Sequence, residues 1–122
     1  ALSMSGQLDE AERYYREALF LARELPDPEG VAIYTGNLAD LALDRGEWPE
    51  AERLAREALG LAENLGHQEL IASGSGQLAK ALARQGRGAE GRVHAGRAVA
   101  IFRKLGSPDL AEAEAVLDEC RE

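Results

Sequence analysis

The sequence is poor in the residues from which disulfide-stabilised, membrane-spanning and β-sheet proteins are built. It has one cysteine, Cys120, so no disulfide can form within the chain, which favours a reducing compartment such as the cytoplasm. No apolar run approaches the about 20 residues of a membrane span, and the first residues lack the basic and apolar segments of a signal peptide. β-branched residues are scarce, whereas Ala, Leu, Glu and Arg are abundant. We therefore expect a cytoplasmic, all-α protein with no membrane partner.

Positive charge is also in short supply. The 22 acidic side chains outnumber the 14 basic ones, and the net charge of −8 argues against nucleic-acid binding, which needs cations to displace phosphate counterions. The sign of the charge alternates along the chain. Residues 1–69 carry 15 acidic and 6 basic side chains, and residues 70–106 carry 1 acidic and 7 basic side chains. Residues 107–122 carry 6 acidic side chains and 1 basic side chain. One option is a homo-oligomer with a head-to-tail charge contact between the acidic region of one copy and the basic region of the next.

An internal repeat organises the rest of the sequence. When the chain is shifted by 40 residues, Gly6 aligns with Gly46 and Gly86, and 12 of the 20 residues in 6–25 equal those in 46–65. Each unit has the apolar spacing of two helices. The first helix of the unit is predicted at about 28–45, 68–85 and, shortened, 108–121, and the second at about 8–25, 48–65 and 88–105. A plain four-helix bundle would explain the apolar stripes but not this period.

Prolines and glycines predict where the helices begin and end. Asp27 and Ser107 each precede a proline, a combination that suits an N-cap followed by the first helical turn. Glycines that suit a left-handed cap follow four predicted helices, at Gly46, Gly66, Gly86 and Gly106. Other glycines lie inside the predicted helices of the third unit, at Gly74, Gly76, Gly91 and Gly96. Because an exposed helical glycine costs about 1 kcal/mol relative to alanine, we expect this unit to be the least stable.

The repeated segment resembles a known signature. Its pattern is Asn37-Leu38-Ala39 … Gly46 … Ala51 … Glu57-Ala58-Leu59, which is similar to the tetratricopeptide repeat. The unit is about six residues longer than the usual 34, as in the variants of kinesin light chains and of bacterial signalling ATPases and transcriptional regulators. Residues 105–111 resemble a linking segment of those bacterial arrays. The resemblance implies a right-handed α-solenoid of about six helices in antiparallel hairpins, which binds a protein or peptide and has neither cofactor nor catalytic activity.

The same resemblance predicts how the chain is organised. It implies a single domain over 1–122, with a truncated first repeat at 1–26, repeats at 27–66 and 67–106, and a capping or partial-repeat helix at 107–122. Residues 1–6 align with the end of a first helix, 41–46, so the helix at 8–25 would lack its usual partner. We expect either a segment of a longer scaffold, sensor or regulatory array, or a second copy that covers this helix.

Few residues suggest chemistry. Glu90 and His94 lie one helical turn apart, which predicts a solvated surface pair rather than a metal or acid–base site. Cys120 shares an apolar stripe with other residues of the last helix, which predicts a packed thiol. Most aromatic residues recur at apolar positions of the repeat, which favours packing over a ligand site. Tyr14 and Tyr15 are possible exceptions among the six: Tyr14, Tyr15, Phe20, Tyr34, Trp48 and Phe102.

The candidate partner-binding residues come from the first helix of each unit, which lines the concave groove in the tetratricopeptide family. Alignment carries that stripe onto Ile33, Gly36, Asn37, Asp40, Leu43 and Asp44, and one unit later onto Ser73, Gly76, Gln77, Lys80, Ala83 and Arg84. The glycines leave room for a peptide backbone, and the two amides can bond to it in both directions. Two ion pairs across neighbouring helices are one possibility, Asp40 with Lys80 and Asp44 with Arg84. The alternative is that Lys80 and Arg84 remain free to bind an acidic peptide.

Overall fold

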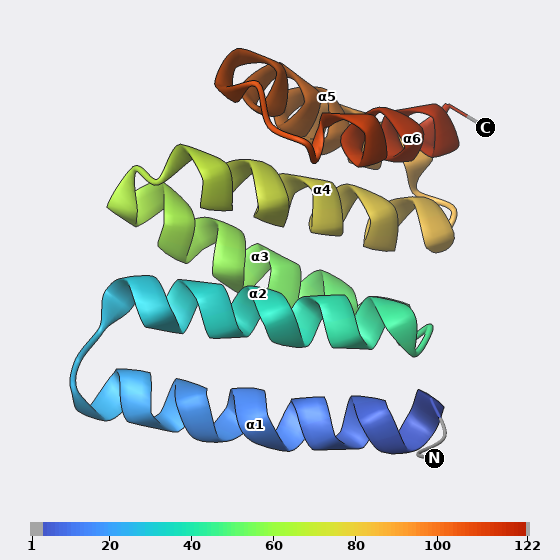
Figure 1. Ribbon diagram of the computed structural model, residues 1–122. Helices are drawn as coiled ribbons and strands as arrows, with labels where there is room; N and C mark the ends of the chain where they lie inside the picture. The colour runs from blue at the N-terminus through green and yellow to red at the C-terminus, as the bar shows by residue number, and fades with distance from the viewer. Residues whose placement is uncertain (1–3, 122) are drawn as a thin grey trace.

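The computed structural model describes residues 4–121, which form six helices joined by short turns (Figure 1). The helices are α1 (Met4–Glu24), α2 (Pro28–Asp44), α3 (Trp48–Leu65), α4 (Gln68–Arg84), α5 (Gly88–Leu105) and α6 (Leu110–Cys120). The predicted all-α class and number of helices are confirmed, since the described residues contain no strand. The helices stack in chain order, so the ends of the described chain lie at opposite ends of the stack (Figure 1).

The start of α1 corrects the prediction. The helix runs without a break from Met4, so Gly6 lies inside a helix and not in the turn that its alignment with Gly46 predicted. Residues 1–3, which the alignment also assigned to the end of a preceding helix, lie outside the described residues. One continuous helix satisfies its backbone by i to i−4 hydrogen bonds without needing a turn at Gly6.

The start of α6 also differs from the prediction. The helix begins at Leu110 and not at Pro108, because the preceding residues form a separate turn. In that turn the Ser107 hydroxyl accepts a hydrogen bond from the Asp109 N–H at 3.1 Å. Glu122, predicted at the polar end of this last helix, lies outside the described residues.

The predicted stop and start signals are otherwise confirmed. The Asp27 carboxylate accepts a hydrogen bond from the Gly30 N–H at 3.0 Å and caps α2. His67 caps α4 by accepting a hydrogen bond from the Leu70 N–H at 3.2 Å. The four turn glycines have positive φ angles of 72°, 66°, 78° and 64°, in the order Gly46, Gly66, Gly86 and Gly106.

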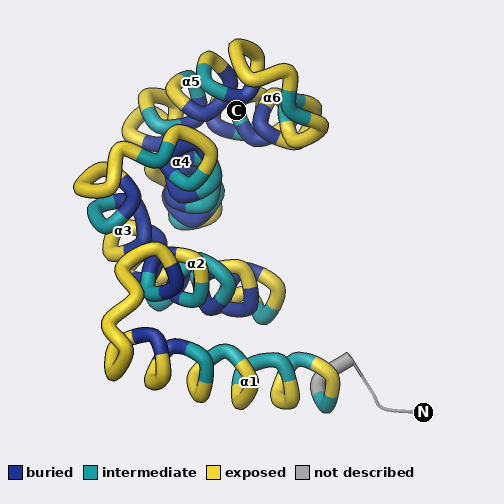
Figure 2. Tube along the Cα trace, turned by 60° about the vertical axis from the view of Figure 1, so that its left-hand side comes forward, coloured by how far each residue is buried: buried dark blue, intermediate teal, exposed yellow. Residues whose placement is uncertain are grey.

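The helices follow a C-shaped arc, in which α2, α4 and α6 face the open side and α3 and α5 lie behind them (Figure 2). The inner helices contact one another in series, α2 with α4 and α4 with α6. Small side chains allow this close stacking, since Ala39, Ala51 and Ala79 are fully buried between helices. The largest hydrophobic side chains with almost no exposed surface are Leu78 and Leu82, which places the centre of the core at α4.

Two glycines inside the helices lie against closely packed neighbours, which the composition alone does not reveal. A Cβ on Gly74 would lie 3.2 Å from the backbone of Leu59, and a Cβ on Gly91 would lie 2.9 Å from the carbonyl oxygen of Ala79. Gly96, by contrast, has open space around its Cβ position. The helix-propensity cost therefore applies to Gly96, whereas at Gly74 and Gly91 it is offset by close helix packing.

Ion pairs between helices account for the alternating charge within one chain. Arg87, which precedes α5, contacts Glu52 of α3 at 2.9 Å, and Arg97 of α5 contacts Glu63 of α3 at 2.7 Å. Further along, Arg84 of α4 forms an ion pair with the α6 carboxylate of Glu119. The arginines of the basic segment, residues 70–106, thus pair with carboxylates of both acidic segments, the one before it and the one after it.

Glu52 is the most enclosed of these carboxylates. Burial on its own would raise the pKa of Glu52, but hydrogen bonds from Gln85 and Arg56 and the charge of Arg87 outweigh burial and lower the pKa below its ordinary value. The side chain is 16% exposed, so the surrounding protein limits how far solvent screens these contacts. Glu52 therefore remains ionised at neutral pH and connects α3 to the turn before α5.

Candidate partner-binding groove

The inner helices form a groove that contains two adjoining hollows. The first lies between α2 and α4, and the second lies between α4 and α6. Asp40, Ser73 and Gln77 line both hollows, so the two are continuous. Eight of the twelve residues predicted for the groove line one or both hollows: Ile33, Gly36, Asn37, Asp40, Ser73, Gly76, Gln77 and Lys80.

The other four predicted residues do not line the hollows. Leu43 is 8% exposed and belongs to the main core cluster, so its side chain is not available in the groove. Ala83 packs beside the cluster that contains Cys120. Asp44 is exposed beyond the end of the hollow. Arg84 pairs with Glu119, and its guanidinium lies 5.2 Å from the centre of the Trp48 ring.

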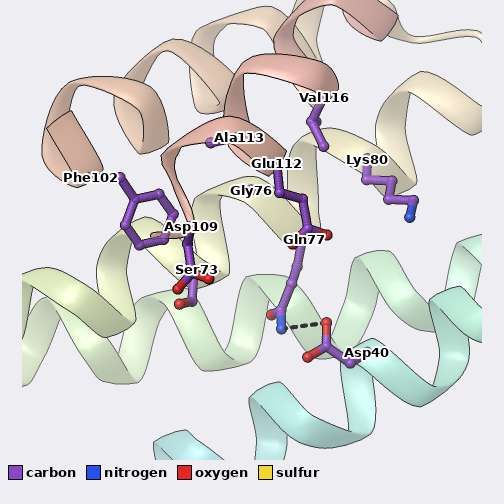
Figure 3. Close-up of a pocket in the computed structure, with 10 residues that line it drawn as sticks. All are labelled: Asp40, Ser73, Gly76, Gln77, Lys80, Phe102, Asp109, Glu112, Ala113 and Val116. Atoms are coloured by element: carbon purple, nitrogen blue, oxygen red, sulfur yellow. Dashed lines mark hydrogen bonds between the residues drawn. The ribbon is translucent and has the colours of Figure 1, made fainter. Parts of the chain in front are cut away.

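Gln77 joins the two inner helices across the floor of the groove. Its Nε2 donates to the Gly36 carbonyl oxygen at 3.0 Å. The same nitrogen donates to Asp40 Oδ1 at 2.9 Å (Figure 3). Because both partners are acceptors, the amide must point its NH₂ group toward α2. The Gln77 Oε1 is buried and has no hydrogen-bond donor among the described residues. One side chain therefore sets the register of α4 against α2 at the groove.

Asp40 is open to solvent at the edge of the groove but has protein on several sides. This partial burial raises the pKa of Asp40 above its ordinary value, and the hydrogen bond from Gln77 opposes the rise. The negative charges of Asp44 and Glu112 raise it further, while Lys80 acts in the opposite direction. The Asp40 carboxylate is thus an acceptor whose negative charge is not fully compensated.

The two ion pairs expected from the repeat alignment do not form. Asp40 accepts from Gln77 instead of pairing with Lys80, because Gln77 lies one turn nearer on the same face of α4. Arg84 pairs with Glu119 and not with Asp44. Among the described residues, Lys80 therefore keeps its ammonium without an ion pair, whereas Arg84 is already engaged.

The start of α6 also contributes to the groove, at positions that were not among the predicted groove residues. Asp109 and Glu112, at the start of this helix, line the second hollow together with Ala113, Val116 and Phe102. The repeat contained the signal for it, since a shift of 40 residues places Ala113 and Val116 on the predicted positions Ser73 and Gly76. Of the two roles predicted for the last helix, capping and a partial repeat, its contribution to the groove favours the partial repeat.

Residues considered for chemistry prove to be packed or isolated. The predicted packed thiol is confirmed, since Cys120 is 2% exposed, its Sγ lies 3.8 Å from the Ala79 carbonyl oxygen, and burial raises its pKa. The predicted pair of Glu90 and His94 is wrong, because Glu90 pairs with Arg56 and Arg87 instead, at 2.9 Å and 2.8 Å. Burial lowers the pKa of His94. Within residues 4–121, no three His, Cys, Asp or Glu side chains are grouped so as to hold a metal ion.

The predicted packing of the aromatic residues holds only in part. Phe102 is buried, and Tyr15 lies against Tyr34 with ring centres 6.5 Å apart. Tyr14 is 62% exposed, as anticipated, but Phe20 is 61% exposed and does not join the core. Both lie on α1, whose outer side no other helix covers (Figure 2).

Comparisons with known proteins agree with this architecture. None of the helices in the described part of the chain is long and apolar enough to cross a membrane. A search of curated proteins found no match. The sequence profile of the tetratricopeptide repeat matches residues 1–64, about half of the chain. Repeats of this kind form helical scaffolds that generally mediate protein–protein interactions. The chain therefore belongs to the tetratricopeptide repeat family.

Proposed function

We propose that this chain is a non-enzymatic, protein-binding scaffold that holds an extended segment of a partner in the groove formed by α2, α4 and α6. The observation that carries the proposal is the pair of adjoining hollows, which run across three helices and contain polar groups at their centre. Gly36 and Gly76 leave the groove open, and Asn37 on its wall can both donate and accept hydrogen bonds. The groove would bind a partner in the same way whether the chain acts as a scaffold by itself or as a sensor or regulatory segment of a larger signalling protein.

Filling the groove should abolish partner binding without unfolding the protein. We expect Gly36→Leu/Gly76→Leu to remain folded, because a Cβ at either position meets no atom closer than 3.9 Å and leucine favours helix. Peptides selected on the wild type from a displayed random library should bind this variant at least about tenfold more weakly. Dissociation constants from fluorescence anisotropy would measure the loss.

The matched control is Gly60→Leu/Gly96→Leu. These glycines lie on α3 and α5, outside the hollows, and their Cβ positions have open space. The control introduces the same two leucines and should bind the selected peptides as the wild type does. Equal binding by the groove variant and the control would show that the peptides bind elsewhere, and would contradict the proposal.

A second candidate function is self-association through α1. Tyr14 is 62% exposed, whereas its counterpart one repeat later, Leu54, is 7% exposed because α2 and its neighbours cover it. Leu21 and Phe20 are also exposed on α1. At the other end of the stack, α6 exposes the charged side chain of Asp118. This charge does not suit an apolar head-to-tail contact with α1 of another copy. Two α1 helices facing each other would instead bury apolar surface from both copies.

Light scattering at high protein concentration tests this second candidate. We expect a dimeric molar mass that is unchanged by added salt, because the contact is apolar. Leu21→Glu should give a monomer, whereas Val93→Glu, at an exposed apolar position of α5, should leave the dimer intact. A monomeric wild type, or a dimer that dissolves only in salt, would exclude the apolar contact.

A further inference from the structure

We infer that the partner segment is cationic, and that a lysine or arginine side chain of it enters the hollow between α4 and α6. This inference rests on the proposed function, since it identifies the chemistry of the segment that the groove holds. It differs from the acidic peptide considered from the sequence, for which Lys80 and Arg84 were the expected contacts.

The charge of the hollow favours a cation. Its lining carries three carboxylates, Asp40 of α2, Asp109 in the turn before α6 and Glu112 of α6, against the single ammonium of Lys80 (Figure 3). None of the three carboxylates forms an ion pair among the described residues. Carboxylates on the outer helices, by contrast, are in contact with arginines, as at Glu52, Glu63 and Glu90. The hollow therefore contains three carboxylates that the described part of the chain leaves without an ion pair.

The carboxylates also repel one another across the groove. Besides burial, which acts most strongly, the charges of Asp44 and Glu112 raise the pKa of Asp40, although Glu112 belongs to a different helix. A cation placed between Asp40 and Glu112 would be attracted by both and would relieve this repulsion. An anion in the same place would add to it.

The shape of the hollow suits a long side chain that is apolar along its length and charged at its end. Phe102, Ala113 and Val116 form an apolar side, and the carboxylates of Asp109 and Glu112 stand near it (Figure 3). Lysine and arginine bury their methylene groups against apolar surface while keeping their charged ends among polar groups. A metal ion does not fit as well, because these carboxylates are not grouped closely enough to coordinate one.

An acidic occupant would find only one cation. Arg84 is held by Glu119 and by the Trp48 ring, so its charge is used within the chain. Lys80 remains, but it shares its hollow with three carboxylates. The balance of charge therefore favours a cationic segment over an acidic one.

Fluorescence anisotropy with three labelled peptides tests the inference. The peptides have equal length and alternate serine with lysine, with glutamate or with glutamine. We expect the lysine peptide to bind most tightly, and Asp109→Asn/Glu112→Gln to weaken its binding about tenfold. Neither substitution removes a contact that the fold needs, since Asp109 makes no side-chain cap hydrogen bond and Glu112 is exposed. Circular dichroism would verify the fold.

The control removes the same charge outside the groove. Glu10→Gln/Glu24→Gln neutralises two exposed carboxylates of α1 and should change the dissociation constant less than about twofold, because exposed charges at a distance are screened. Equal weakening by both variants would show attraction to the net charge alone and would overturn the inference. Preference for the glutamate peptide, or no binding of the lysine peptide, would overturn it as well.

The displayed library separates failure of this inference from failure of the proposed function. If the library returns peptides that need an open groove but are acidic or uncharged, the inference is overturned and the proposed function stands. If no selected peptide distinguishes Gly36→Leu/Gly76→Leu from its control, the proposed function itself fails. Enrichment of lysine and arginine in groove-dependent peptides would support both.

Discussion

Replacing Leu82 with alanine should lower the free energy of unfolding by about 3 kcal/mol. Leu82 is 0% exposed and belongs to the main core cluster. Six of the fifteen buried residues of that cluster are alanines, whose short side chains cannot move to fill a cavity. The loss therefore combines the lost burial of the leucine side chain with an unfilled cavity, and urea denaturation would measure it.

Leu105→Ala is the matched control for Leu82→Ala. It removes the same atoms near the end of α5, where the leucine is 49% exposed, and should cost about 1 kcal/mol or less. Similar losses for the two variants would mean that the Leu82 site collapses around the smaller side chain, contrary to the expected cavity. A loss of 3 kcal/mol is a large part of the about 5–15 kcal/mol that stabilises a typical domain.

Two alanine substitutions on the same helix should change stability in opposite directions. Gly91→Ala should destabilise the protein by about 1–3 kcal/mol, because its Cβ would lie 2.9 Å from the Ala79 carbonyl oxygen and 3.1 Å from the Cys120 sulfur. Gly96→Ala should stabilise it by up to about 1 kcal/mol, because no atom lies within 4 Å of its Cβ position. Thermal and urea unfolding of both variants would measure the difference.

The opposite signs test whether close packing or helix propensity dominates at these glycines. If both variants stabilise the protein, helix propensity dominates and α5 can move away from α4 at little cost. If both destabilise it, the space around Gly96 is needed in a way that the structure does not show. The expectation that the third unit is the least stable remains a prediction, and it now depends on Gly76 and Gly96, whose Cβ positions are not closely packed.

Much of the fold was predictable because it depends on short-range interactions. The helix ends follow from Asp27, from the prolines of the first turns and from glycines that take positive φ at little cost. The repeat period and its signature identified the family and the all-α class. The groove positions of the family, carried over by the repeat alignment, also placed two thirds of the predicted groove residues along the hollows, because residues on one face of a helix share their direction.

The sequence by itself thus determined the helices, their order and the faces that α2 and α4 turn toward the groove. Only the tertiary structure decided that Gln77 and not Lys80 meets Asp40, that Arg84 pairs with Glu119, and that α6 adds Asp109 and Glu112 to the groove. Only it separated Gly91, which packs against α4, from Gly96, which does not. The reason is physical: helix periodicity and capping act over a few residues, whereas these contacts depend on distances between helices that packing of the whole stack sets.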